Sequence, residues 1–341
     1  MLPISIRYIS IDRRLNQKMS TTTKRTNLNT LNAIYDLRVS PASFDFITFL
    51  ASAETERVNR GFEKIKLIIL KSTSNDGFRI DNFRGQAQNI HFFYNVMLQS
   101  ITLFPNINAF HYCELCELPA GINSSNVFPA DWTISRPTEG HLARTFVQAK
   151  HNGRLVESLK VPNYAMEALD SFLYANKKEQ IITLTMREIK RDDPEGKRSM
   201  KLDSWSKYFD FLLCNTHFVP VVVRDWSRMF DEKIFARAIE SPIFSDNVAI
   251  RAALYERASL NFFKVNGTTT LSLFNQRSVT AVFFEPDSHA ATAKEWYKSR
   301  YEMDHGDQFP GLNSNSLFYW GPDTFENIMS CHHALIERLN P

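Results

Sequence analysis

One stretch shows the organisation of the chain most clearly: LNFFKVNGTTTLSLFNQRSVTAVFF, residues 260–284. It begins with an apolar, aromatic run (260–265) typical of a buried strand, and Asn266-Gly267 then supplies a turn. A short helical pattern follows near residues 269–274, and a second buried strand at 280–284. A strand, a helix and a strand in succession predict neighbouring parallel strands.

The same alternation extends outward through the second half of the chain. We expect strands at 181–186 and 219–223 and helices at 202–215 and 249–258. The chain closes with a predicted helix over 324–339, which Pro322 and Asp323 precede, and Asp323 is well placed to cap it.

The first half has the same organisation. A short apolar run at 33–39, helical spacing over 43–60 and a buried strand at 65–70 form a βαβ unit. A further strand is expected at 107–113, and the Asn, Ser and Pro content of 119–137 indicates a long loop.

Length divides this pattern into two domains. A chain of 341 residues exceeds what one core usually supports. We expect a flexible leader at 1–32, one α/β domain at 33–178 and a second α/β domain at 179–341. The predicted fold class is α/β, with two doubly wound, Rossmann-like lobes facing a cleft.

Composition and charge limit the partners and the cellular location that we expect. A net charge of +3 is too mild to indicate a nucleic-acid partner, and the apolar runs are too short to span a bilayer. The N-terminus lacks the apolar core of a secretory signal, so a cytoplasmic protein is expected, with translation starting at Met1 or Met19. Cys113 and Cys116 have the spacing of half a zinc site, but nothing completes it, and we expect free thiols and no metal.

Ligands of such sheets bind beyond the carboxyl ends of the strands. Arg187 follows the strand at 181–186, and the loop after it carries Lys197, Arg198 and Ser199. These cations and this hydroxyl suit a diphosphate, although most charged loops are simply solvated.

A second candidate is the turn Asn266, Gly267, Thr268 and Thr269, between a strand and a helix. Glycine permits close approach of a ligand, and the start of a helix offers N–H groups to an anion. Turns also need glycine for their own sake, so both interpretations stay open.

Two further groups lie near these strand ends. Arg224-Asp225 follows the strand at 219–223. Two interpretations are open: these charges contact the base or ribose of a nucleotide, or they cap the next segment. Arg251 and Tyr255 share one helix face at i, i+4 spacing.

Residues 255–268 (YERASLNFFKVNGT) and 280–284 (TAVFF) together resemble the C-terminal domain of GT-B glycosyltransferases such as the heptosyltransferases. The stretches 183–188 (TLTMRE), Arg198-Ser199 and Trp205 are similar to uncharacterised bacterial proteins of surface-polysaccharide synthesis. The resemblance covers about residues 180–330 and implies a GT-B-like glycosyltransferase, in which 33–178 is the acceptor-side domain and 179–341 the nucleotide-sugar-binding domain. Its implied partners are a nucleotide sugar, which is a substrate rather than a cofactor, and a glycan or lipid-linked acceptor, with peripheral membrane association as an option.

The absence of one metal-binding motif and the presence of two polar residues bear on the expected chemistry. The sequence lacks Asp-x-Asp, so a metal-independent transfer is expected, with the cations above neutralising the diphosphate. Asp45 is the first candidate for the catalytic base and His111 the second, against structural roles at a helix start and beside a strand. A sugar-nucleotide epimerase or hydrolase and a non-catalytic binding module remain alternatives.

Overall fold

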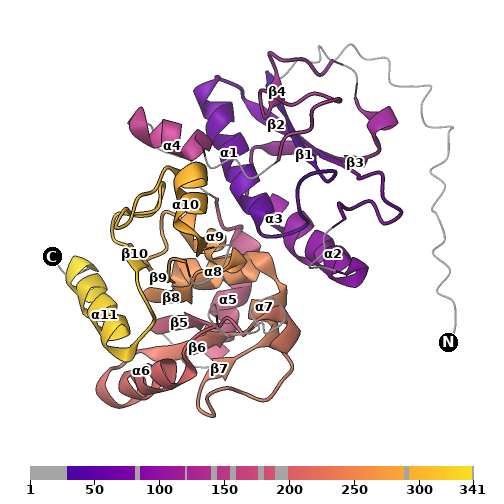
Figure 1. Ribbon diagram of the computed structural model, residues 1–341. Coiled ribbons are helices and arrows are strands. Elements are labelled where there is room, and N and C mark those ends of the chain that lie inside the picture. The colour runs from indigo at the N-terminus through magenta and orange to yellow at the C-terminus, as the bar shows by residue number, and fades with distance from the viewer. Residues whose placement is uncertain are drawn as a thin grey trace, which may run out of the picture.

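The computed structural model describes residues 29–80, 85–119, 121–139, 144–153, 159–175, 180–188, 199–287 and 292–339. Two parallel β-sheets with flanking helices form two lobes (Figure 1). The prediction of an α/β protein with two Rossmann-like lobes is confirmed.

The first sheet has four parallel strands in the order β3-β2-β1-β4. Their bounds are β1 (Thr30–Asp36), β2 (Lys64–Leu70), β3 (Ile107–Cys113) and β4 (Val127–Phe128). Strand β1 starts inside the segment predicted as a leader, because Leu31 points into the core between the apolar residues of β2.

Helices cover one face of this sheet. They are α1 (Asp45–Asn59) and a continuous run made of α2 (Gln86–Phe92), the π-helical η2 (Phe93–Leu98) and α3 (Gln99–Ile101). On the other face, Trp132 and Val127 pack on Ile34 and Ile68, so an irregular segment covers the half near the carboxyl ends of the strands.

The second sheet has six parallel strands in the order β10-β9-β8-β5-β6-β7. Their bounds are β5 (Ile181–Thr185), β6 (Val219–Val223), β7 (Ile239–Glu240), β8 (Leu260–Lys264), β9 (Thr280–Phe284) and β10 (Leu317–Trp320). The chain adds strands on one side of β5 and then returns to build outward from its other side. The order therefore reverses between β5 and β8.

Two helical layers enclose this second sheet. One face packs against α6 (Leu202–Asn215) and α11 (Phe325–Leu339). Trp205 of α6 is fully buried against Phe262 and Phe283 of the sheet. The other face carries α5 (Asn163–Ala175), α7 (Pro242–Asp246), α8 (Val248–Arg257), α9 (Thr270–Leu273) and α10 (Lys294–Tyr301). One apolar cluster runs from this layer into the first lobe, so the lobes share a continuous core.

Several elements lie where no regular structure was predicted, including α4 (Arg144–His151), β10 and the two-residue strands β4 and β7. The expected cap Asp323 is corrected as well. Its carboxylate is fully buried and accepts hydrogen bonds from Trp205 Nε1 (2.7 Å) and Lys264 Nζ (2.9 Å), so it joins α11 to the sheet.

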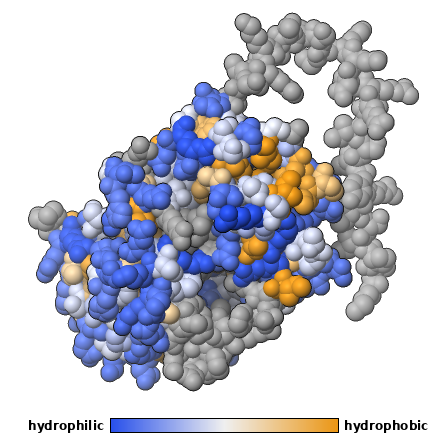
Figure 2. All heavy atoms as spheres, turned by 45° about the horizontal axis from the view of Figure 1, so that its top comes forward, coloured by the Kyte–Doolittle hydropathy of each residue, from blue (hydrophilic) through white to orange (hydrophobic). Residues whose placement is uncertain are grey.

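Hydrophilic side chains cover most of the face shown in Figure 2, interrupted by small apolar patches. Among the described helices, none combines the length and the apolar character needed to cross a membrane.

Candidate functional site at the β5–β8 strand ends

The reversal of strand order lies between β5 and β8, which pair directly, with Thr185 opposite Phe263. Beyond the carboxyl end of β5 comes Arg187, and beyond that of β8 comes the turn at 266–269. The structure thus brings together the two segments that the sequence marked as candidate phosphate binders. We call Arg187 and residues 266–269 the switch-point site, because open α/β sheets bind ligands where the strand order reverses.

A buried tyrosine connects the two halves of this site. The hydroxyl of Tyr255, on α8, lies 3.0 Å from Thr185 Oγ1 at the end of β5 and also hydrogen-bonds Thr268. Burial raises the pKa of Tyr255, so the phenol stays protonated and can serve in both hydrogen bonds. Its i, i+4 spacing from Arg251 and its place at the start of the 255–268 stretch are the sequence signals that indicate this residue.

The turn at 266–269 is organised by its own side chains. Asn266 Oδ1 accepts hydrogen bonds from Thr268 Oγ1 (2.7 Å) and from the Thr269 N–H (3.2 Å). Thr269 Oγ1 in turn accepts from the Asn266 N–H (3.1 Å). This reciprocal capping fixes the loop, while the helix that follows, α9, has only four residues.

Gly267 contacts the first lobe. A Cβ built on Gly267 would lie 3.0 Å from the Cβ of Phe44, which precedes α1. A side chain at residue 267 would therefore crowd Phe44 where the lobes meet, a constraint that the sequence did not indicate beside the turn and ligand-approach interpretations. The contact also brings the start of α1 next to the switch-point site.

Charged side chains surround Arg187, which is itself buried. Asp225, at the end of β6, accepts a hydrogen bond from the Glu188 N–H (2.6 Å). Burial raises the pKa of Asp225, whereas this hydrogen bond and the charge of Arg187 oppose that rise. Arg187 and Asp225 are thus close enough to interact, and the end of β6 belongs to the same electrostatic group.

Two arginines fix the neighbouring loops. Arg224 forms a two-pronged ion pair with Glu188, at 2.6 and 2.8 Å. Arg251 on α8 donates to the carbonyls of Phe244 and Ser245 in α7, and its burial lowers its pKa. Both side chains serve the framework, in line with the structural role considered for Arg224.

The loop that follows Arg187 is described only at its end. Lys197 and Arg198 lie outside the described residues. Ser199 lies within them, and the next residue, Met200, donates its N–H to the carbonyl of Arg187 (3.2 Å). The end of the loop therefore returns to the strand end where it began.

Asp45 is the first residue of α1, adjacent to Phe44 and so beside the switch-point site. Its carboxylate accepts a hydrogen bond from Ser43 Oγ (2.9 Å), and its charge helps burial to raise the pKa of Tyr301 at the end of α10.

His111 lies elsewhere, on the face of the first sheet opposite α1, where it lines a surface groove. The structure therefore does not bring His111 together with Asp45. Within the described ranges, no three His, Cys, Asp or Glu side chains come together as a metal site.

Comparison with known proteins finds no matching family model and no matching curated sequence. Solved structures do match. The glycosyl transferase family 9 protein from Veillonella parvula is 11% identical, with 91% of this chain and 98% of that one covered, at a TM-score of 0.47. The fucosyltransferase NodZ from Bradyrhizobium is 12% identical, with 72% and 93% covered, at 0.31. A putative UDP-N-acetylglucosamine 2-epimerase from Listeria monocytogenes is 10% identical, with 91% and 88% covered, at 0.34. The first two of these structures are of glycosyltransferases.

Proposed function

We propose that this protein is a metal-independent glycosyltransferase that moves a sugar from a nucleotide sugar to a glycan or lipid-linked acceptor. The diphosphate of the donor binds at the switch-point site, between Arg187 and residues 266–269. In this proposal the reaction takes place in the cytoplasm and contributes to surface-polysaccharide synthesis.

One observation carries the proposal: Arg187 and the turn at 266–269 follow adjacent strands at the point where the strand order reverses. A guanidinium can pair with phosphate oxygens in a two-pronged geometry, and a pre-organised turn offers backbone N–H groups without a large ordering cost. Tyr255 supports the proposal because its hydroxyl holds both strand ends at one spacing.

In this proposal the first lobe supplies the catalytic base. In an inverting transfer, Asp45 accepts the proton of the acceptor hydroxyl as that oxygen forms a bond to the anomeric carbon. The bond from this carbon to the diphosphate breaks, and Arg187 stabilises the negative charge that develops on the leaving group. The contact of Phe44 with Gly267 supports this assignment, since it brings the start of α1 to the donor site.

The test is a calorimetric titration with UDP, GDP, CMP and ADP and their sugar conjugates. We expect at least one nucleotide to bind, and Arg187→Gln to weaken its binding at least tenfold, as loss of a charge-assisted contact implies. Arg277→Gln is the matched control, because Arg277 is exposed and precedes β9. It therefore lies at the amino ends of the strands, away from the carboxyl ends where Arg187 lies. Absence of binding by every nucleotide, or equal losses in the two variants, would refute the site.

Catalysis is tested separately with Asp45→Asn. This variant should bind the nucleotide as the parent protein does but fail to transfer sugar to an added acceptor. Donor consumed without an acceptor would instead indicate an epimerase or hydrolase, and binding without any turnover would indicate a non-catalytic module.

A further inference from the structure

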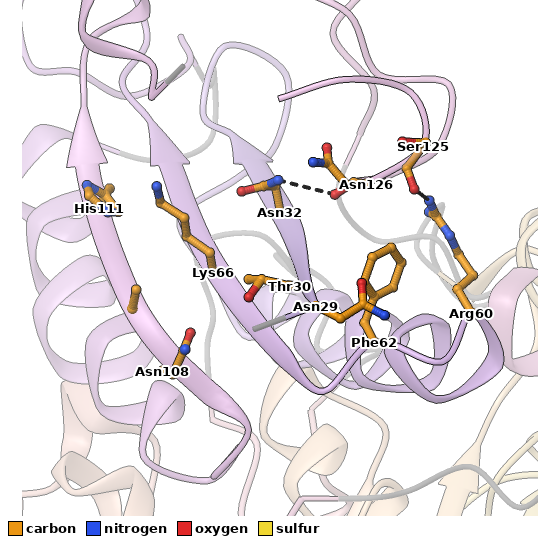
Figure 3. Close-up of a pocket in the computed structure, with 11 residues that line it drawn as sticks. Asn29, Thr30, Asn32, Arg60, Phe62, Lys66, Asn108, His111, Ser125 and Asn126 are labelled. Carbon is orange, nitrogen blue, oxygen red and sulfur yellow. Dashed lines mark hydrogen bonds between the residues drawn. The ribbon is translucent and has the colours of Figure 1, made fainter. Parts of the chain in front are cut away.

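A groove of about 910 Å³ lies on the first sheet, on the face opposite α1 (Figure 3). Strands β1, β2 and β3 form its floor, and Arg60, Phe62, Ser125 and Asn126 form one side. We call it the sheet-face groove. Its volume falls in the range of about 300–1,000 Å³ that is usual for small-molecule sites.

The floor of the groove is polar where a parallel sheet is usually apolar. Asn32 and Lys66 are direct neighbours across β1 and β2, and their side chains rise from the same face (Figure 3). Buried parallel strands normally carry apolar residues on both faces, because helices cover both. On the same face but nearer the carboxyl ends, Ile34 and Ile68 follow that rule under Trp132. The change from apolar to polar coincides with the edge of the covering segment.

Charge in the groove has one sign. Lys66, His111 and Arg60 line it, and no aspartate or glutamate is among its described lining residues. Arg60 is engaged, since it donates to the Val127 carbonyl (2.9 Å) and lies over the Phe62 ring (5.0 Å). The side chains of Lys66 and His111 form no hydrogen bond or ion pair within the part of the chain that the structure describes. Their nitrogens are available for an anion.

The asparagine side chains that line the groove indicate which groups the ligand carries besides an anion. Asn32 donates to the Asn126 carbonyl (3.4 Å), and Asn108 is exposed on β3. Carboxamides offer both donors and acceptors, the combination that matches sugar hydroxyls. Phe62 lies at one side of the groove, beneath the Arg60 guanidinium, and the floor carries no Phe, Tyr or Trp, so the described lining has no row of rings on which successive bases of a single-stranded nucleic acid stack.

We propose that the sheet-face groove binds a phosphorylated carbohydrate. Its phosphate lies between Lys66 and His111, which are diagonal neighbours on β2 and β3, because Ala109 is the direct partner of Lys66. Its hydroxyls reach the carboxamides of Asn32 and Asn108. This site is separate from the switch-point site, and the proposal does not depend on the function assigned there.

The experiment titrates the full-length protein with glucose 6-phosphate, followed by ligand-observed NMR, with glucose and inorganic phosphate as separate probes. We expect glucose 6-phosphate to bind at least tenfold more tightly than either probe. Lys66→Gln should weaken binding of glucose 6-phosphate and of phosphate about tenfold. Lys207→Gln, the same charge change on the exposed side of α6, should leave both unchanged.

A second variant separates sugar recognition from charge. Asn108→Ala should reduce the affinity for glucose 6-phosphate several-fold and leave that for inorganic phosphate unchanged. The Arg187→Gln variant should bind glucose 6-phosphate as the parent protein does, which keeps this result independent of the donor site. The proposal is overturned if glucose 6-phosphate binds no better than phosphate, if Lys66→Gln has no effect, or if an RNA oligonucleotide binds more tightly and displaces the sugar phosphate.

Discussion

Phe44 and Gly267 lie in direct contact across the two lobes, so close that a Cβ at residue 267 would lie 3.0 Å from the Cβ of Phe44. Phe44 also forms an edge-on contact with Phe92, and the guanidinium of Arg251 lies 5.9 Å from the centre of its ring. Phe44, which precedes the candidate base Asp45, thus packs on the turn that forms part of the candidate donor site. Packing between the lobes and the geometry of the proposed site depend on the same pair.

Gly267→Ala should therefore destabilise the protein. The added methyl has to displace Phe44, and overpacking of this kind costs about 1–3 kcal/mol. Denaturant unfolding of Gly267→Ala, Phe44→Ala and the double variant measures the coupling. We expect Gly267→Ala to cost less in the Phe44→Ala background, because the Phe44 ring atoms that would lie 3.2 and 3.4 Å from the added methyl are then gone. Strict additivity of the two changes would contradict the contact.

Tyr255→Phe should loosen the connection between β5 and the turn after β8. Loss of one buried hydroxyl that serves Thr185 and Thr268 should lower the free energy of unfolding by about 1 kcal/mol. If the switch-point site holds a diphosphate, affinity for the nucleotide identified by calorimetry should also fall several-fold. Tyr208→Phe is a matched control, because its buried hydroxyl serves the opposite face of the sheet. An equal loss of nucleotide affinity in both variants would speak against a local role for Tyr255.

Local patterns predicted most of the second sheet. Strand β6 and helix α6 begin and end where the sequence indicated, because a continuous β-branched run and a regular apolar helical stripe each have one structural solution. Strands β4 and β7 have two residues each, too few to show any periodicity. Helix α10 was missed because a single residue of its eight, Tyr297, is buried.

The candidate site was predictable only in parts. Arg187 and the 266–269 turn each follow a recognisable strand, but their proximity depends on β5 pairing with β8, which local sequence does not encode. The contact of Phe44 with Gly267 is likewise tertiary, and so is the role of Asp323, whose partners are 59 to 122 residues away.

Asp323→Ala should be among the most damaging single changes. The carboxylate pairs with buried Lys264 and accepts hydrogen bonds from the Trp205 indole and the Lys201 N–H. Removing Asp323 leaves the buried ammonium with only the longer contact to Glu285 Oε2 (3.4 Å) and takes the acceptor from two N–H donors, at a cost of up to about 3–5 kcal/mol. Urea denaturation should show that Lys264→Met in the Asp323→Ala background recovers part of this loss. If the second change adds a further full penalty instead, the charge of Lys264 is not the cause.

Acid stability should depend on His332, a buried residue of α11 whose Nδ1 lies 2.8 Å from the Tyr208 hydroxyl. Burial, with a smaller contribution from His333, lowers the pKa of His332 to about 4. The unfolded chain, whose histidine titrates near its ordinary value of about 6.5, binds more protons between these limits. Stability from this residue is therefore complete above about pH 6.5 and is lost as the pH falls toward 4, by up to about 3 kcal/mol. His332→Phe should flatten the pH dependence of unfolding over this range, whereas His217→Gln, at an exposed position, should leave it unchanged. Parallel pH profiles for His332→Phe and the parent protein would show that His332 is not the group responsible.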